Sequence, residues 1–159
     1  MSAAPPKTLH YKRATFATQL PVDYLYSPSH GWAVRVGENR WRVGLTKFAT
    51  RMLGEMVDHG FEIEPGAVVT AGQVIGWVEG FKAISDLYCI IAGEFLGRNE
   101  GLGTNIKLIG KWPYTEGWLY EASGQPDSRC LTVDAYRELL DRTIDRILAK
   151  QKAAGNDTD

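Results

Sequence analysis

One lysine stands where chemistry could be done on it: Lys82, in the stretch VEGFKAISDLY of residues 78–88. The residues on each side of it alternate as two short strands do, and Gly80 gives the backbone freedom for a tight turn. Glu79 and Asp86 place a carboxylate on either side of the lysine, as an acidic collar that a basic enzyme surface could bind. The pattern is typical of a lysine presented at a hairpin tip for covalent modification, although a merely solvated turn lysine has the same local sequence.

The other candidate nucleophiles are two cysteines, Cys89 and Cys130. They form no C-x-x-C pair, and no neighbouring base motif predicts a thiol enzyme. Cys89 is interpreted as a buried strand cysteine that packs as a small apolar group, with redox-active thiols at both positions as the alternative. The three histidines, His10, His30 and His59, are too far apart in the sequence to predict a metal site.

The composition excludes several classes of function. The 159 residues have a formal net charge of −1 with both signs mixed, so no nucleic-acid surface is predicted. No apolar run reaches the roughly 20 residues that a membrane-spanning helix needs. The basic start of the chain is followed by no apolar segment typical of a secretion signal. We therefore expect a cytoplasmic protein with reduced cysteines that binds neither membranes nor nucleic acid.

Short strands joined by glycine turns account for most of the chain. Residues 32–45 alternate on both sides of a Gly-Glu-Asn turn and predict a β-hairpin. Apolar runs punctuated by glycine predict further strands within residues 57–80, a strand pair that turns near residues 92–93, and a last strand at residues 117–123. Regular short strands of this kind favour a β-barrel or a β-sandwich.

Two helices are expected. Thr46 can cap a short one that Gly54 ends, because apolar residues recur between them at helical spacing. Thr132 can cap an amphipathic C-terminal helix that covers the sheet. We predict a flexible N-terminal arm (1–20), a carrier domain (21–131), a C-terminal helix packed on that domain (132–151) and a disordered tail (152–159).

Five stretches of the chain occur in the order, and with nearly the spacing, of the H proteins of the glycine cleavage system. They are HGW with VGLTKFATRMLGEM, VEGFKAISDLY, AGEFLGRNEGL, PYTEGWLYEA and LTVDAYRELL. The chain resembles this family from about Tyr24 to Leu140. In the family pattern Glu-Ser-Val-Lys-Ala the lysine carries lipoate, and Lys82 occupies its place, with Gly80 and Phe81 replacing Ser and Val.

The resemblance implies a mainly β fold, the barrel-sandwich hybrid of lipoyl and biotinyl carriers, with short helices and the C-terminal helix. It implies lipoate joined through an amide to Lys82, because a biotin carrier would have methionines where Phe81 and Ala83 flank the lysine. The protein would be a carrier with a swinging arm and no enzyme. A lipoate ligase or lipoyl transferase would load it, and dihydrolipoamide dehydrogenase would reoxidise the arm.

Departures from the family pattern bear on the cargo. The family's His-Glu-Trp, whose glutamate lines the cleft for a cationic aminomethyl cargo, is here His30-Gly31-Trp32, and Met52 stands where some members have histidine. Loss of one partner from such a charged contact costs on the order of 1–3 kcal/mol. A cleft lined by Met52 and Phe81, with His30 beside it, would suit a neutral or sulfur-bound cargo better.

These departures, together with a thiol at Cys89, are similar to those of lipoate-binding proteins that work with heterodisulfide-reductase-like complexes in sulfur oxidation. That branch is our first prediction for the function. The alternative is a glycine cleavage H protein, whose partners are glycine decarboxylase and aminomethyltransferase.

Overall fold

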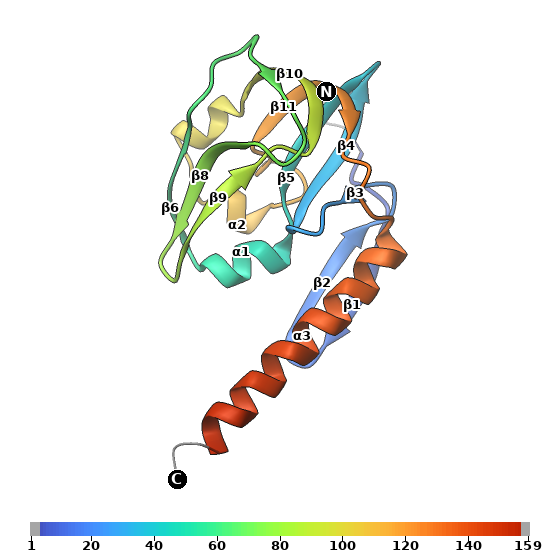
Figure 1. Ribbon diagram of the computed structural model, residues 1–159, viewed down its shortest axis with the longest axis vertical. Helices are drawn as coiled ribbons and strands as arrows, with labels where there is room; N and C mark the ends of the chain where they lie inside the picture. The colour runs from blue at the N-terminus through green and yellow to red at the C-terminus, as the bar shows by residue number, and fades with distance from the viewer. Residues whose placement is uncertain (1–3, 157–159) are drawn as a thin grey trace.

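The computed structural model describes residues 4–156, and two antiparallel sheets form its main body (Figure 1). The larger sheet has the strand order β3 (Leu25–Tyr26), β4 (Gly31–Gly37), β5 (Arg40–Leu45), β11 (Tyr120–Pro126), β10 (Ile91–Arg98) and β7 (Val68–Val69). The smaller sheet has the order β6 (Met56–Phe61), β8 (Val74–Gly80) and β9 (Ile84–Tyr88). Apolar side chains of both sheets meet in one buried cluster, which includes Val43, Val78 and Phe95. The mainly β architecture expected from the strand pattern is confirmed.

The sequence predicted the hairpin over residues 32–45 correctly, but the turn near residues 92–93 wrongly. The hairpin over residues 32–45 is confirmed, since β4 pairs with β5 through a turn in which Asn39 has a φ of 53°. The turn expected near residues 92–93 is wrong, because β10 runs through them and pairs with both β11 and β7. A Cβ on Gly93 would lie 1.9 Å from the carbonyl oxygen of Ser123 in β11. This glycine therefore marks a close approach of two strands and no reversal of the chain.

The first predicted helix is α1 (Lys47–Leu53), which begins and ends where the sequence indicates. The Thr46 side chain accepts an amide hydrogen bond from the first turn, and Gly54 ends the helix with a φ of 83°. A 3₁₀ helix, η1 (Glu100–Gly103), and the one-turn helix α2 (Leu108–Lys111) lie between β10 and β11. The two sheets together are called the barrel below. Helix α1 lies at the end of the barrel toward which the tip between β8 and β9 points (Figure 1).

The N-terminal segment corrects the expectation of a flexible arm over residues 1–20, of which residues 1–3 lie outside the described part of the chain. Residues 8–21 form an antiparallel hairpin of β1 (Thr8–Arg13) and β2 (Phe16–Pro21). Its apolar side chains are buried: Tyr11, Phe16 and Leu20. A flexible arm was predicted because the apolar residues of this hairpin are few and far apart, and they become a buried face only when a partner element covers them.

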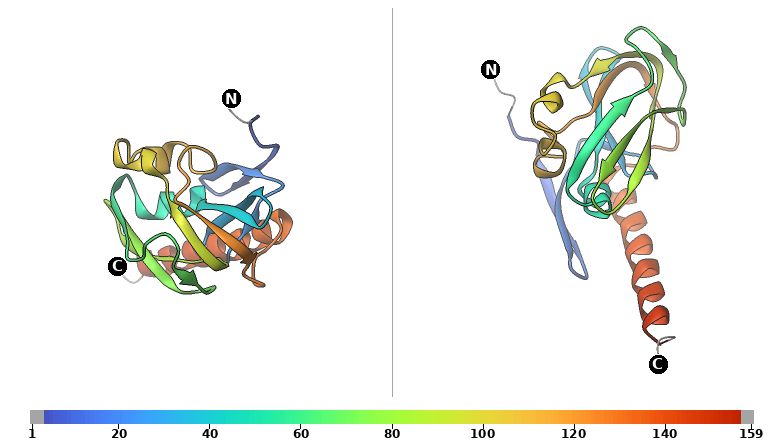
Figure 2. Two further views of the ribbon diagram at one scale, coloured as in Figure 1. Left: turned by 90° about the horizontal axis from the view of Figure 1, so that it is seen from above. Right: turned by 90° about the vertical axis from the view of Figure 1, so that its left-hand side faces the viewer.

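The partner element is α3 (Val133–Asn156), whose apolar stripe packs against the hairpin. Tyr136, Leu140 and Ile144 join the hairpin residues in a second buried cluster. The helix and the hairpin project side by side from the end of the barrel that carries α1 (Figure 2). The start of the predicted helix packs on the edge of the main sheet, where the Tyr136 ring stacks on that of Tyr26 in β3 at 4.6 Å between centroids. The helix packs on the hairpin as well, which was not expected.

Ion pairs also join the β1–β2 hairpin to α3 at the exposed edge of this interface. The Arg13 guanidinium donates two hydrogen bonds to Asp145, at 2.8 and 2.9 Å, and lies 3.3 Å from Asp141. The Tyr11 hydroxyl donates at 2.8 Å to the Oδ1 atom of Asp141, the same oxygen that Arg13 approaches. Helix α3 continues through Asn156, so residues 152–156 of the expected tail are helical, while residues 157–159 lie outside the described part of the chain.

Candidate functional site

Lys82 lies at the tip between β8 and β9, in a turn whose backbone is fixed from both sides. The Gly80 amide donates to the Ala83 carbonyl at 2.9 Å, which closes the turn on itself. The Phe81 amide donates to the Glu55 carbonyl at 3.0 Å, and the Lys82 amide to the Leu53 carbonyl at 2.9 Å. The lysine side chain is exposed. An exposed side chain thus extends from a turn whose backbone is held by three hydrogen bonds.

Gly80 has a different role from the one predicted. Its φ is not in the left-handed region, so the turn does not depend on the conformational freedom of glycine. A Cβ on Gly80 would lie 2.1 Å from the carbonyl oxygen of Leu53, and only a residue without a side chain permits that approach. The glycine lets the end of α1 come close enough to bind the turn.

The acidic collar expected around the lysine is only partly formed. Asp86 is exposed on β9, whereas Glu79 is partly buried on β8. Among residues 4–156, no carboxylate forms an ion pair with Lys82. The amine is therefore available to a reagent or an enzyme.

A cleft of about 310 Å³, here called the apolar cleft, runs along β9. Its other walls come from α1 and from the β4–β5 hairpin, and the residues that matter below are His30, Gly31, Phe48, Met52 and Asp86. Among the described residues, 4–156, Asp86 is the only Asp, Glu, Lys or Arg that lines it. Met52 lies in its wall, 50% exposed, as predicted. Phe81 was expected there too, but this is wrong, because its side chain points out from the turn and is 77% exposed.

Gly31 leaves room for a larger side chain in the wall of this cleft. A Cβ there would lie 3.4 Å from the carbonyl oxygen of Gly44 and 3.8 Å from the Cδ1 atom of Ile90, which are ordinary contacts. The backbone φ of Gly31 is outside the left-handed region. The absence of a carboxylate at this position is therefore a property of the sequence, and the fold does not require it.

His30 joins the apolar cleft to helix α3. Its Nδ1 atom lies 2.9 Å from the Tyr136 hydroxyl, which in turn donates to Oγ1 of Thr46, the cap of α1. Its ring packs against Phe48 at 4.7 Å between centroids. Burial lowers the pKa of His30 to about 4, so the imidazole is neutral at pH 7 and adds no positive charge to the cleft. This contact spans 106 residues of sequence, and no local pattern predicts it.

The N-terminal hairpin packs against helix α1, which forms one wall of the apolar cleft. Phe16 of β2 packs edge-on against Phe48 of α1, with 5.6 Å between centroids. Arg51, also on α1, donates to the Thr15 carbonyl at 3.2 Å and covers the Phe16 ring. Helix α1 is therefore held between the hairpin on one side and the Lys82 turn on the other.

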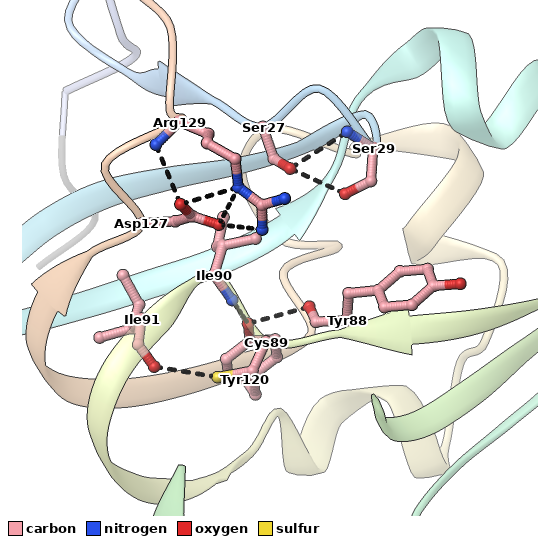
Figure 3. A network of polar contacts seen from close by, with 9 residues as sticks. All are labelled: Ser27, Ser29, Tyr88, Cys89, Ile90, Ile91, Tyr120, Asp127 and Arg129. Carbon is pink, nitrogen blue, oxygen red and sulfur yellow. Dashed lines mark hydrogen bonds and ion pairs between the residues drawn. The ribbon is translucent and has the colours of Figure 1, made fainter. Parts of the chain in front are cut away.

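The two cysteines lie away from the apolar cleft and are poor nucleophiles. Cys89 is fully buried, and its thiol donates to the Ile91 carbonyl at 3.0 Å (Figure 3). Burial raises the pKa of the Cys89 thiol, and it raises that of Cys130 to about 11. Neither forms the thiolate that redox chemistry needs at pH 7. The structure thus supports the packing interpretation of Cys89 and gives no support to the redox alternative.

Figure 3 shows why the region of Cys89 is rigid. The Tyr120 hydroxyl accepts the Ile90 amide at 3.1 Å, and Asp127 binds Arg129 through both carboxylate oxygens. The first contact ties the segment between β9 and β10 to β11, and the second lies within the segment before α3. The Asp127 amide joins the two segments, because it donates to the Ile90 carbonyl at 2.8 Å. Within residues 4–156, no three His, Cys, Asp or Glu side chains are grouped so as to hold a metal ion. In the same residues, no helix has both the length and the apolar character to span a membrane.

Comparison with known proteins gives one consistent family. The model of the family described as glycine cleavage H-protein matches residues 24–141. The glycine cleavage system H protein of Corynebacterium jeikeium is 41% identical over 124 residues, which are 76% of this chain and 96% of that protein. That of Sodalis glossinidius is 34% identical over 127 residues, which are 78% of this chain and 96% of that protein.

A solved structure agrees with these sequence matches. The crystal structure of a glycine cleavage system H protein from Mycobacterium marinum superposes with a TM-score of 0.67 at 30% sequence identity. It covers 74% of this chain and 95% of that chain. The matched range 24–141 contains the two sheets, the Lys82 turn and the apolar cleft, whereas the β1–β2 hairpin and the last part of α3 lie outside it.

The low pKa of His30 predicts a specific loss of stability in acid. The folded protein resists protonation of His30 down to about pH 4, while the unfolded chain takes up the proton near pH 6.5. Its contribution to the free energy of unfolding is therefore complete above pH 6.5 and falls by about 3 kcal/mol as the pH drops to 4. The variant His30→Gln, which does not titrate, should lack this part of the pH dependence.

Urea unfolding followed by tryptophan fluorescence at several pH values between 7 and 4 measures this difference. Other groups, including His59 and the paired carboxylates, are common to both proteins and cancel in the comparison. Parallel curves for the wild type and the variant would contradict the buried, neutral state of His30.

Proposed function

Because the chain belongs to the glycine cleavage H-protein family, we propose that Lys82 carries its lipoate and that the protein is the aminomethyl carrier of glycine cleavage. Members of this family are carriers and have no catalytic reaction of their own. The observation that carries the assignment of Lys82 is its exposed amine on a turn fixed by the carbonyls of Leu53 and Glu55. The partners proposed on this basis are glycine decarboxylase, aminomethyltransferase and a lipoate ligase or lipoyl transferase, with dihydrolipoamide dehydrogenase to reoxidise the arm.

The residues around Lys82 fit a lipoyl group. The attachment point is exposed, and the apolar cleft begins at the residues that follow it, Ala83 and Ile84. Apolar walls from α1 and β9 suit the hydrocarbon part of such an arm, because contact with them removes apolar surface from water. The fixed backbone keeps the position of attachment constant while the side chain moves.

When bound, lipoate supplies a disulfide that takes up two electrons and leaves one sulfur free to hold a cargo. The chain contributes position, charge and shielding. The amide at Lys82 removes the positive charge of the amine, so the tether itself carries none. Asp86 gives the apolar cleft one negative charge, and the neutral His30 leaves that charge unopposed. A cation brought into the cleft would be favoured by this single carboxylate.

A second candidate function rests on the same cleft. With Gly31 in place of the carboxylate typical of the family, Asp86 is the only formal charge in the lining. With one carboxylate in place of two, the cleft holds a cation less strongly than the family pattern would. This is the argument for a neutral or sulfur-bound cargo, as in carriers that work with heterodisulfide-reductase-like complexes. The similar proteins reported above are glycine cleavage system H proteins, so the aminomethyl cargo is the better supported proposal. Turnover with glycine decarboxylase and aminomethyltransferase supports the first function, and its absence supports the second.

The attachment site is tested by the variant Lys82→Arg. The protein from its native host should have the intact mass of the chain plus one lipoyl group, and peptide mapping should place that group on Lys82. The variant keeps the positive charge but has no acylable amine, so its mass should show no lipoyl group. Lipoylation that persists in the variant, or native protein that is never lipoylated, would overturn the assignment.

The cargo is tested by restoring the missing carboxylate with Gly31→Glu. A Cβ at this position makes only ordinary contacts, and the residue lines a cleft of about 310 Å³. A second negative charge there should slow loss of the cationic aminomethyl cargo by about tenfold, or about 1.4 kcal/mol. Gly31→Gln is the matched control of equal size without charge. The measurement is the rate of hydrolytic cargo release from the loaded carrier. Equal rates for both variants would show that charge at this position does not hold the cargo.

A further inference from the structure

A second groove adjoins Lys82 on the side away from the apolar cleft. It has a volume of about 540 Å³, lies between α1 and α2, and is here called the basic groove. Its lining includes five cations and one carboxylate: Lys47, Arg51, Lys82, Lys107, Lys111 and Glu55. These sum to +4 in a chain whose formal net charge is −1, so the rest of the protein carries −5. The basic groove is thus a concentrated positive region on a protein that is acidic elsewhere.

The positive charge of the basic groove is not neutralised locally. Glu55, the one carboxylate in the lining of the groove, lies 3.6 Å from the Lys107 amine. Both side chains are mostly exposed, so this ion pair is weak. Lys47 donates to the Gly110 carbonyl at 3.2 Å, and Lys111 lies 5.9 Å from the Trp112 ring centre. Neither contact removes charge. Several like charges in one concave surface produce a potential that attracts an acidic surface.

Lys82 itself belongs to the basic groove and not to the apolar cleft. Its side chain lines the basic groove, and its Cγ atom would be 3.0 Å from a Cβ built on Gly54. It is absent from the lining of the apolar cleft. The unmodified lysine therefore borders the basic groove, whereas the residues that follow it border the apolar cleft, which suits a loaded arm. The step that uses the unmodified amine is its acylation.

We propose that the basic groove docks an acidic surface of the enzyme that attaches lipoate to Lys82. This inference rests on the proposed function, which makes Lys82 the attachment site. In that step the Lys82 ammonium gives one proton to solvent, and its nitrogen forms a bond to the acyl carbon of the enzyme's activated lipoyl donor. The bond from that carbon to its activating group breaks, the electron pair leaves with that group, and the second proton of the nitrogen passes to solvent. The product has lost one of the five positive charges of the basic groove. Attraction to the acidic surface is then weaker, which favours release of the lipoylated protein.

The test compares two variants with the same change in net charge. Lys107→Gln/Lys111→Gln removes two exposed charges from the basic groove, and Lys7→Gln/Lys12→Gln removes two exposed charges from the N-terminal segment and β1. Each protein is acylated by a lipoate–protein ligase with lipoate and ATP, and kcat/KM is measured from intact mass. At low salt the groove variant should lose about tenfold in kcat/KM, mostly through KM, while the control stays near the wild type.

Salt should remove the difference, because the attraction is between exposed charges. At about 0.5 M NaCl the groove variant and the wild type should be acylated at similar rates. Equal rates at low salt, or an equal loss in both variants, would overturn the docking proposal and leave Lys82 as the attachment site. A wild-type protein that the ligase does not acylate at Lys82 would overturn the proposed function itself. Circular dichroism and the Tm of both variants verify the fold, and Lys111→Gln alone is a milder variant that should show a smaller loss in the same direction.

Discussion

Two backbone hydrogen bonds hold the lysine-bearing turn: Phe81 donates to the Glu55 carbonyl and Lys82 to the Leu53 carbonyl. Each is worth about 0.5–1.5 kcal/mol net, and together they fix a turn whose side chains are exposed. They depend on Gly80, because a Cβ there would collide with the Leu53 carbonyl. A swinging arm transfers its cargo between fixed places only if its attachment point stays in place.

The turn also separates two surfaces of opposite character. The apolar cleft has one carboxylate and a neutral His30, which suits the loaded arm, whereas the basic groove surrounds the unmodified amine. Helix α1 forms a wall of both, and the β1–β2 hairpin and α3 support it from behind. The family match covers residues 24–141, so the β1–β2 hairpin lies outside it, whereas Tyr136 of α3 lies inside it.

Sequence patterns predicted the features that local residues determine. The caps of α1, the hairpin over residues 32–45 and the exposed turn at Lys82 follow from residue types within a few positions of one another. The folding of residues 8–21 was missed, since its burial depends on α3, more than 100 residues away. The role of Gly80 was misjudged for a similar reason: its neighbour is a backbone carbonyl, which leaves no trace in residue type. The basic groove was invisible because its cations come from three separate segments.

The rigidity of the Lys82 turn is the central claim, and amide hydrogen exchange of the native protein, measured residue by residue by NMR, tests it most directly. Phe81 and Lys82 have exposed side chains, but their backbone amides are hydrogen-bonded. We expect both amides to exchange far more slowly than those of an unstructured peptide, with protection comparable to the strand amides of β8. Exchange of these two amides at the rate of an unstructured peptide would contradict the claim and leave the lysine on a mobile loop.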